Sequence, residues 1–283
     1  MSQIVILKSN GDEEFFDESK LVRSLKKAKA TDAEIEHVVQ YVKSKLHKDI
    51  STLDIYGMAK RALLSYQKRN PNSIRYSLKQ SVMELGPSGF PFEQFVARMY
   101  VEMGYQCQVG VMVQGNCIQH EVDILAHNDM EVICIEAKFH NESYMKSDTK
   151  VALYVKSRFD DLIGQPIIVN NISKIITKGI LVTNTNFTDS ARHYVECKNT
   201  FELLSWNKPV ESSMLDRIEK YKLYPITVIP DLTKKEVTMM LENGLVVCSD
   251  IHARPQILKE LGIKPQRQTA ILQTINQICV HAD

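Results

Sequence analysis

The hydrophobic pattern of the first 85 residues predicts a β-hairpin followed by four helices. Two short segments with alternating apolar positions flank Asn10-Gly11, a dipeptide that favours a tight turn between antiparallel strands. Further along, apolar residues recur every three or four positions, as in amphipathic helices. A Thr31-x-x-Glu34 capping box marks one helix start, and the last helix extends over residues 74–85.

A cluster of helix breakers at residues 86–89 predicts a linker, and the periodicity changes after it. One more amphipathic helix is followed by short apolar strands that alternate with helices, an order typical of a mixed α/β core. The expected strands cover residues 105–113, 121–127, 131–139, 178–185 and 201–206, and the expected helices cover residues 91–103, 151–162 and 189–198. Residues 167–170 add a short apolar segment without an assigned partner, and short helices follow from Pro209.

We therefore expect an α/β multi-domain protein in three parts. Residues 1–86 would form the hairpin and a helical bundle, residues 87–210 an α/β core with a mixed sheet, and residues 211–283 a small helical domain. A chain of 283 residues has room for this, because domains commonly hold about 100–200 residues.

Charge and composition narrow the choice of function only slightly. The net charge is +1, with +4 in residues 1–85 and −4 in residues 86–212. A DNA-binding protein usually shows a basic surplus, so a nucleic-acid function must rest on motifs here. No apolar stretch approaches the roughly 20 residues that cross a bilayer, and the first residues turn acidic too soon for a signal peptide. The six cysteines lie far apart, so we expect a reduced, cytoplasmic protein without zinc, disulfides or membrane contact.

The sharpest chemistry lies on two neighbouring expected strands. Asp123 stands in the first, and Glu136-Ala137-Lys138 ends the second. Carboxylates at the ends of adjacent strands can share a hard cation such as Mg²⁺, and residues two apart in a strand project from the same face. A structural ion pair explains the same residues. The Glu-x-Lys string also occurs at residues 18–20 and 196–198, but only the string at 136–138 follows an apolar strand, and the one at 196–198 has a helix-end context that offers no second carboxylate.

The region around these residues resembles the Mrr-like restriction endonucleases, which belong to the PD-(D/E)xK nuclease fold. The resemblance covers about residues 88–207 and rests on four segments in order: FPFEQFVARMYVEMGYQCQV, HEVDILAH, ICIEAKFHN and GILVTNTNFTDSARHYVECKNTFELLSW. Val122 stands where the family signature has proline, and Glu136 stands where many Mrr-like members have glutamine. Neither departure removes a ligand.

The resemblance implies a metal-assisted hydrolysis of phosphodiesters. Asp123 and Glu136, with the backbone carbonyl of Ala137, would hold Mg²⁺ or Mn²⁺. Lys138 would orient the attacking water or stabilise charge on the phosphate, and Glu93 matches the acidic position of the first helix.

Four further residues are candidates for catalysis or nucleic-acid contact. His120 and His140 flank the motif, as general base, phosphate contact or strand-end hydrogen-bonding residues. Tyr154 and Arg158 stand one turn apart on the next helix, whose face would look toward the site, with Arg158 on phosphate. Alternatively this helix packs on the sheet, with Arg158 paired to Asp161 or in solvent.

The N-terminal segment resembles the ATP-cone, a nucleotide-sensing domain. The resemblance covers about residues 4–85 and rests on three segments: ILKSNGDEEFFDESKLVRSLKKA, ISTLDIYGMAKRAL and SIRYSLKQSVMEL. It implies nucleotide binding over the hairpin and the first helix, and no P-loop is present. The residues placed near the nucleotide are Lys8 and Lys20 at the phosphates, Asp17 and Leu21 near the base, Thr52 at a phosphate, and Ser9 where the family often has a second basic residue. A small module with solvated lysines is the alternative.

Together these resemblances imply a Mg²⁺-dependent DNA endonuclease, regulated by ATP or dATP and serving defence against foreign DNA. A homo-oligomer is expected, because cutting both strands needs two active sites. Two alternatives stay open: an ATP-responsive, oligomerising DNA-binding protein with an inactive core, and an RNA-directed nuclease. The C-terminal helices could bind DNA as a helix-hairpin-helix-like element, or serve packing or dimerisation.

Overall fold

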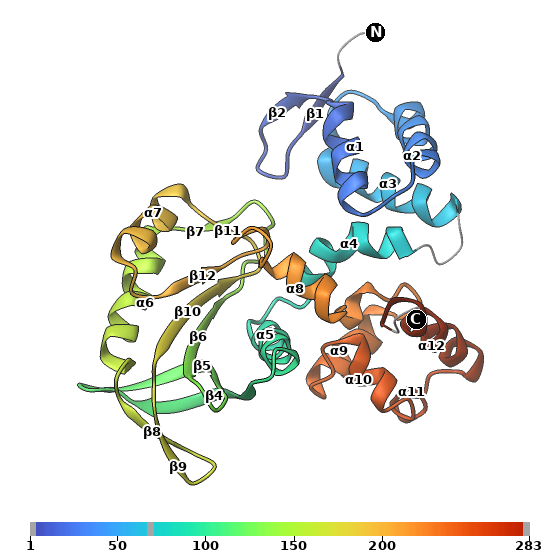
Figure 1. The fold of residues 1–283 in the computed structure, drawn as a ribbon. Helices are drawn as coiled ribbons and strands as arrows, with labels where there is room; N and C mark the ends of the chain where they lie inside the picture. Colours follow the sequence, from blue (N-terminus) through green and yellow to red (C-terminus); the bar gives the residue numbers. More distant parts are fainter. Residues whose placement is uncertain (1–3, 67–70, 280–283) are drawn as a thin grey trace.

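The computed structural model describes residues 4–66 and 71–279. Figure 1 shows three parts: an N-terminal unit, a central sheet flanked by helices, and a C-terminal group of short helices. Within the described residues, no helix is long and apolar enough to cross a membrane.

The N-terminal unit is a small sheet covered by helices, as the sequence predicts. Strand β1 pairs antiparallel with β2 and parallel with β3, so β1 lies in the middle. Helix α1 begins where the Asp17 carboxylate accepts the N–H of Ser19 at 2.9 Å, and the predicted capping box of Thr31 and Glu34 begins α2. The elements are β1 (Val5–Leu7), β2 (Glu13–Phe15), α1 (Glu18–Lys27), α2 (Asp32–Lys45), β3 (Ile50–Ser51), α3 (Thr52–Tyr66) and α4 (Pro71–Met83).

The central part is a five-stranded mixed sheet in the order β12-β10-β6-β5-β4. Strands β4, β5 and β6 form an antiparallel meander, and β6, β10 and β12 run parallel. Helix α5 covers one face, while α6 and α7 cover the other (Figure 1). The elements are α5 (Phe90–Glu102), β4 (Gln106–Gln114), β5 (Gln119–His127), β6 (Val132–Lys138), β7 (Lys146–Ser147), α6 (Thr149–Leu162), β10 (Lys178–Thr183), β11 (Asn186–Phe187), α7 (Asp189–Lys198) and β12 (Glu202–Leu204). This confirms the predicted mixed α/β core.

One feature of this part was only half predicted. The apolar segment at residues 167–170 contributes to β8 (Pro166–Val169), which pairs with β9 (Ile172–Ile175) in a hairpin outside the main sheet. The turn residues Asn170 and Asn171 both have positive φ, the backbone that tight hairpin turns require. The second strand was missed because its pattern is short and mostly exposed.

The C-terminal part consists of helices, as predicted, and all of them are short except α12. They are α8 (Met214–Tyr221), a 3₁₀ turn η1 (Ile226–Val228), α9 (Lys234–Glu242), α10 (Cys248–Ala253), α11 (Ile257–Glu260) and α12 (Pro265–Cys279). Their apolar side chains share one continuous core with α5 and the α5 face of the sheet. Arg98 of α5 pairs with Asp250 of α10 at 3.1 Å, which ties the two parts together.

Helix α4 belongs to two cores at once. Tyr76 packs against the core of the N-terminal unit, whereas Ile74, Leu78 and Val82 lie in the core shared by the sheet and the C-terminal helices. The hydroxyl of Thr227 also donates to the carbonyl of Ser81 at 2.7 Å. The predicted linker at residues 86–89 therefore follows a helix that is already packed against the central part.

The docking of α6 on the sheet can be tested at Gly179. A Cβ atom there would lie 2.4 Å from Cδ2 of Phe159, so Gly179→Ala forces α6 away from β10. Overpacking of this kind costs about 1–3 kcal/mol, and we expect that loss of unfolding free energy in urea titrations.

Gly57→Ala in α3 is the matched control, because its Cβ would meet only Arg61 at 3.5 Å. Replacing Phe159 by leucine in the Gly179→Ala background should recover part of the loss. An unchanged stability of Gly179→Ala would show that α6 does not pack on β10 in this way.

Candidate active site and nucleotide-binding surface

The predicted acidic residues meet where β5 and β6 separate. The ladder between the two strands ends at the pair Ile124 and Ile135, one residue short of Asp123 and Glu136. Beyond this point the carboxylate of Asp123 accepts the backbone N–H of Ala137 at 2.7 Å. Asp123 thus satisfies a backbone donor that a continued ladder would have paired, and its carboxylate stays at the opening.

A local distortion of the sheet gives Asp123 its place. Residues two apart in a regular strand share a face, yet Val122 lies in the core under α6 and Ile124 in the core under α5. Opposite Asp123 in β4 stands Gly110, whose φ of +66° is a conformation that glycine adopts readily. The exchange of faces occurs at these two residues.

Glu136 is held by the helix that follows it. Nη1 of Arg158 lies 2.9 Å from Oε1 and 2.8 Å from Oε2 of Glu136, and Nη2 donates to the carbonyl of Glu121. The sequence left two arrangements of α6 open. In the structure, Arg158 faces Glu136 and is not paired with Asp161. Tyr154, one turn earlier, is 64% exposed, and its ring centre lies 5.8 Å from Cζ of Arg158.

Three carboxylates influence one another at this opening. Burial raises the pKa of Glu136 to about 7, and the charge of Asp123 adds to this while Arg158 opposes it. Glu93 on α5 joins them, because burial and then the charge of Asp123 raise its pKa to about 7. Burial also raises the pKa of Asp123, although the hydrogen bond from the N–H of Ala137 lowers it. A cluster of this kind favours a compensating cation.

Lys138 borders a small pocket next to Glu136. The pocket has a volume of about 290 Å³ and is lined by Glu136, Lys138 and α6 residues that include Lys150 and Tyr154. Lys150 was not among the residues predicted from the sequence. The signal was present, because Lys150 stands one helical turn before Tyr154 and hence on the same face of the helix.

The two histidines have partners of their own. Nε2 of His120 lies 2.8 Å from a carboxylate oxygen of Asp161, which also accepts the N–H groups of Cys117 and Ile118 in the turn between β4 and β5. His120 thus ties this turn to α6. Nε2 of His140 lies 2.9 Å from the hydroxyl oxygen of Ser147, and burial lowers the pKa of the His140 ring.

The residues expected at the nucleotide gather at one end of the N-terminal sheet. Glu14 on β2 lies 3.3 Å from Nζ of Lys8 and 2.8 Å from Nζ of Lys20. Parallel pairing of β1 with β3 brings the start of α3 alongside, so the hydroxyls of Ser9 and Thr52 lie 3.5 Å apart. This end of the sheet thus places two ammonium groups and two hydroxyls together.

The two remaining nucleotide candidates have mainly structural contacts. Asp17 caps α1, and its hydrogen bonds to Ser19 lower the pKa of its carboxyl. Leu21 is only 6% exposed and packs in the core of the N-terminal unit.

Comparison with known proteins finds three matching segments along the chain. Residues 4–77 match the ATP cone domain family, and residues 86–211 match a restriction endonuclease family. The chain joins an ATP cone domain to a restriction endonuclease domain. Residues 224–279 match a third family, described as AF1548-like, C-terminal.

Known relatives share the larger part of the chain. An uncharacterized protein of Archaeoglobus fulgidus is 29% identical over 184 residues, which are 65% of this chain and 99% of the relative. The crystal structure of a protein of unknown function, AF1548, matches 68% of this chain and 98% of its own with a TM-score of 0.54 and 29% identity. The MspJI restriction endonuclease in complex with a 27-mer oligonucleotide gives a TM-score of 0.36 at 12% identity over 62% of this chain and 36% of its own.

The restriction endonuclease domain offers a donor set that suits magnesium. In the described part of the chain, no three His, Cys, Asp or Glu side chains form a ready-made metal group. Mg²⁺ commonly uses only one or two protein carboxylates together with water and phosphate, and Asp123 and Glu136 supply these. Both oxygens of Glu136 contact Arg158, so one of them must leave the guanidinium before it can bind a cation.

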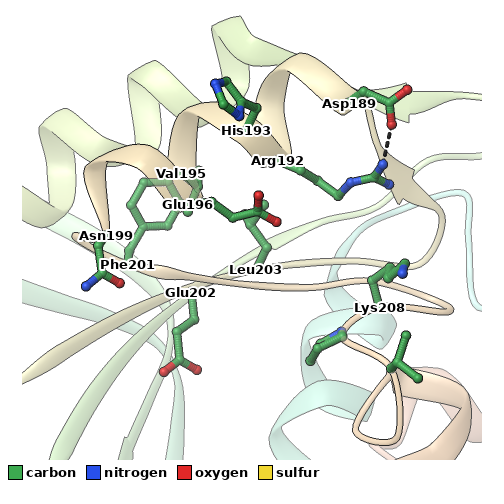
Figure 2. A pocket seen from close by; sticks show the side chains of 12 residues that line it. Asp189, Arg192, His193, Val195, Glu196, Asn199, Phe201, Glu202, Leu203 and Lys208 are labelled. Carbon is green, nitrogen blue, oxygen red and sulfur yellow. Dashed lines mark hydrogen bonds and ion pairs between the residues drawn. The ribbon is translucent and has the colours of Figure 1, made fainter.

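The string at residues 196–198 lies at the end of helix α7, as expected. Figure 2 shows Glu196 on α7 in an open pocket of about 720 Å³, where Asp189 and Glu202 also lie. The side chain of Glu202 points away from Glu196, and Asp189 faces Arg192, so the absence of a second carboxylate beside Glu196 stays a prediction. Both neighbours already have a cation, because Asp189 pairs with Arg192, and Glu202 with Lys178 at 2.7 Å.

The ATP cone domain can be tested at Glu14. If Lys8 and Lys20 bind phosphate as predicted, this carboxylate would compete for them, so we expect Glu14→Gln to tighten ATP binding. Exposed ion pairs contribute about 0.2–1 kcal/mol each, so loss of both pairs corresponds to a gain of about 2–30-fold in affinity, measured by calorimetry.

Glu13→Gln, an exposed change on the same strand, controls for net charge and should leave the affinity near that of the wild type. Weaker binding by Glu14→Gln would mean that this carboxylate helps to hold the nucleotide.

Proposed function

We propose that the protein is a Mg²⁺-dependent DNA endonuclease whose rate is set by a nucleotide bound to the ATP cone domain. One observation carries the proposal: Asp123, Glu136 and Lys138 occupy the opening between β5 and β6 within a restriction endonuclease domain. A restriction-type enzyme of this kind would act on foreign DNA.

The side chains divide the proposed reaction between them. Asp123 and Glu136, with the carbonyl of Ala137, hold the cation, which supplies a polarised phosphate and a more acidic water when it is bound. Lys138 projects on the same side of β6 as Glu136 and places an ammonium group beside the scissile phosphate. Arg158, released from one oxygen of Glu136, offers a planar fork for a phosphate oxygen.

The surface next to this opening supports nucleic acid as the substrate. Lys150 and Tyr154 on α6 border the pocket of Lys138, and Tyr154 exposes a large aromatic face. Lysines neutralise phosphates, and an exposed aromatic ring can stack on a base or sugar. DNA is preferred over RNA because the domain matches a restriction endonuclease family.

We further propose ATP or dATP as the effector. Lys8, Lys20 and Thr52 would hold its phosphates at the end of the N-terminal sheet. Light scattering with and without nucleotide measures whether the protein forms the expected homo-oligomer.

A second candidate is a DNA-binding protein that does not cut. The contact of Arg158 with both oxygens of Glu136 favours it, because a permanent ion pair there would keep out a cation. Cleavage of plasmid DNA, modified plasmid DNA and RNA in Mg²⁺ distinguishes the candidates.

The role of Lys138 gives the first test. Lys138→Ala should lower the cleavage rate by about 100-fold or more, the usual effect of removing one group that stabilises developing charge. Its side chain is exposed, so unfolding free energy should change by less than about 0.5 kcal/mol.

Lys198→Ala removes the matching lysine of the string on α7 and should cut at the wild-type rate. Cutting at the wild-type rate by Lys138→Ala would contradict the catalytic role of Lys138.

The two acidic positions give a separate test. Glu136→Gln should cut poorly and bind Mg²⁺ or Mn²⁺ less tightly, because the amide carries no charge. The matched change Glu196→Gln should affect neither property, since Glu196 lies in the other pocket. Asp123→Ala should lose measurable metal binding in calorimetry. An unaltered metal affinity in Asp123→Ala would refute its place as a ligand.

A further inference from the structure

The strand end that carries Lys138 is fixed by one buried amide. Oδ1 of Asn184 accepts the N–H of His140, and Nδ2 donates to the carbonyl of the same residue, both at 2.8 Å. Asn184 is 0% exposed and follows β10, whose pairing with β6 ends at Thr183 and Lys138. The side chain continues the ladder for one step and so positions the backbone just after Lys138.

Helix α4 and the residues after it contact this same strand end. Nδ2 of Asn184 lies 3.1 Å from the sulfur of Met83, the last residue of α4. The backbone of Gly86 passes so close to Phe139 that a Cβ atom would lie 2.6 Å from Cε1 of that ring and 2.8 Å from Oδ1 of Asn141. Phe139 directly follows Lys138, so a displacement of α4 reaches the end of β6 through packed atoms.

The first half of α4 is joined to the nucleotide end of the ATP cone domain. The ring of Tyr76 stacks on Tyr56 of α3 with centroids 5.2 Å apart, and its hydroxyl lies near the side chain of Ser24 of α1. Ser24 stands one helical turn after Lys20, which lies at the proposed phosphate position. At one end, helix α4 thus contacts residues that lie one helical turn from Thr52 and Lys20 of the proposed nucleotide site. At its other end it contacts the residues that fix the backbone just after Lys138.

We propose that α4 transmits nucleotide occupancy to the Lys138 strand within a single chain, through Met83 and Asn184 and through Gly86 and Phe139. The inference rests on the proposed function, and it places the coupling in the packing within one chain and not in a change of assembly. A tightly packed core passes on a shift of a helix because its neighbours cannot absorb it. Coupling between binding sites is reciprocal, so DNA must change nucleotide affinity as much as nucleotide changes DNA affinity.

Nucleotide affinity is therefore the readout, measured by calorimetry with and without a short DNA duplex. Ca²⁺ replaces Mg²⁺ in both arms so that the duplex stays intact. Light scattering records how many protein chains each particle contains, with the mass of the duplex subtracted. In the wild type we expect the dissociation constant of the nucleotide to differ by about 5-fold or more between the two arms, the usual size of such coupling. The number of protein chains per particle should be the same in both arms.

Gly86→Ala is the decisive variant, because it pushes on Phe139 without touching either binding site. We expect it to remove most of the difference, and Phe139→Leu in the same background to restore it. Met83→Leu removes the sulfur acceptor but keeps an apolar side chain, and should weaken the coupling. Gly57→Ala in α3 should couple like the wild type.

Three results would overturn the inference: no difference in the wild type, a difference that appears only with a change of mass, or full coupling in both Gly86→Ala and Met83→Leu. Failure of the proposed function shows itself elsewhere, as the absence of Mg²⁺-dependent cutting or as normal cutting by Lys138→Ala. If the protein cuts DNA but its affinities for nucleotide and DNA are independent, only the proposed role of α4 is contradicted.

Discussion

The central constraint in this structure is that β5 and β6 stop pairing one step before their acidic residues. A continued ladder would have consumed the N–H of Ala137, and Asp123 would have become one more strand residue. Because the strands separate, the carboxylate takes that N–H and remains beside Glu136. The distortion at Gly110, the coverage by α5 and the approach of Arg158 from α6 all serve this one opening. The proposed chemistry depends on it.

The sequence predicted this region well where local rules govern it. Turn residues, capping boxes and apolar periodicity placed most elements, and strand context singled out the string at residues 136–138 from two others. The contacts of Arg158 and His120 could not be predicted, because they depend on how α6 is rotated on the sheet. The hairpin of β8 and β9 was missed in part for lack of a buried face, which is the signal that periodicity detects.

The division into domains was predicted from breakers, and packing complicates it. Gly86 and its neighbours break the helix, yet the chain there lies tightly against Phe139. Composition identifies where regular structure ends but carries no information on whether the connecting residues are free. In this protein the last helix of the ATP cone domain contributes side chains to the core of the nuclease part, so the two domains share structure across their sequence boundary.

The ion pair between Arg158 and Glu136 bears on the stability of the fold in the absence of metal. A buried carboxylate with no partner would weaken the fold whenever magnesium is scarce. The guanidinium serves as an internal counter-ion, so the proposed metal would not be needed for folding, in contrast to small zinc domains that unfold when chelated. Metal uptake at the proposed site would exchange one cation for another on a scaffold that is already folded. On the proposed function, gain or loss of the metal would then leave the folded state intact.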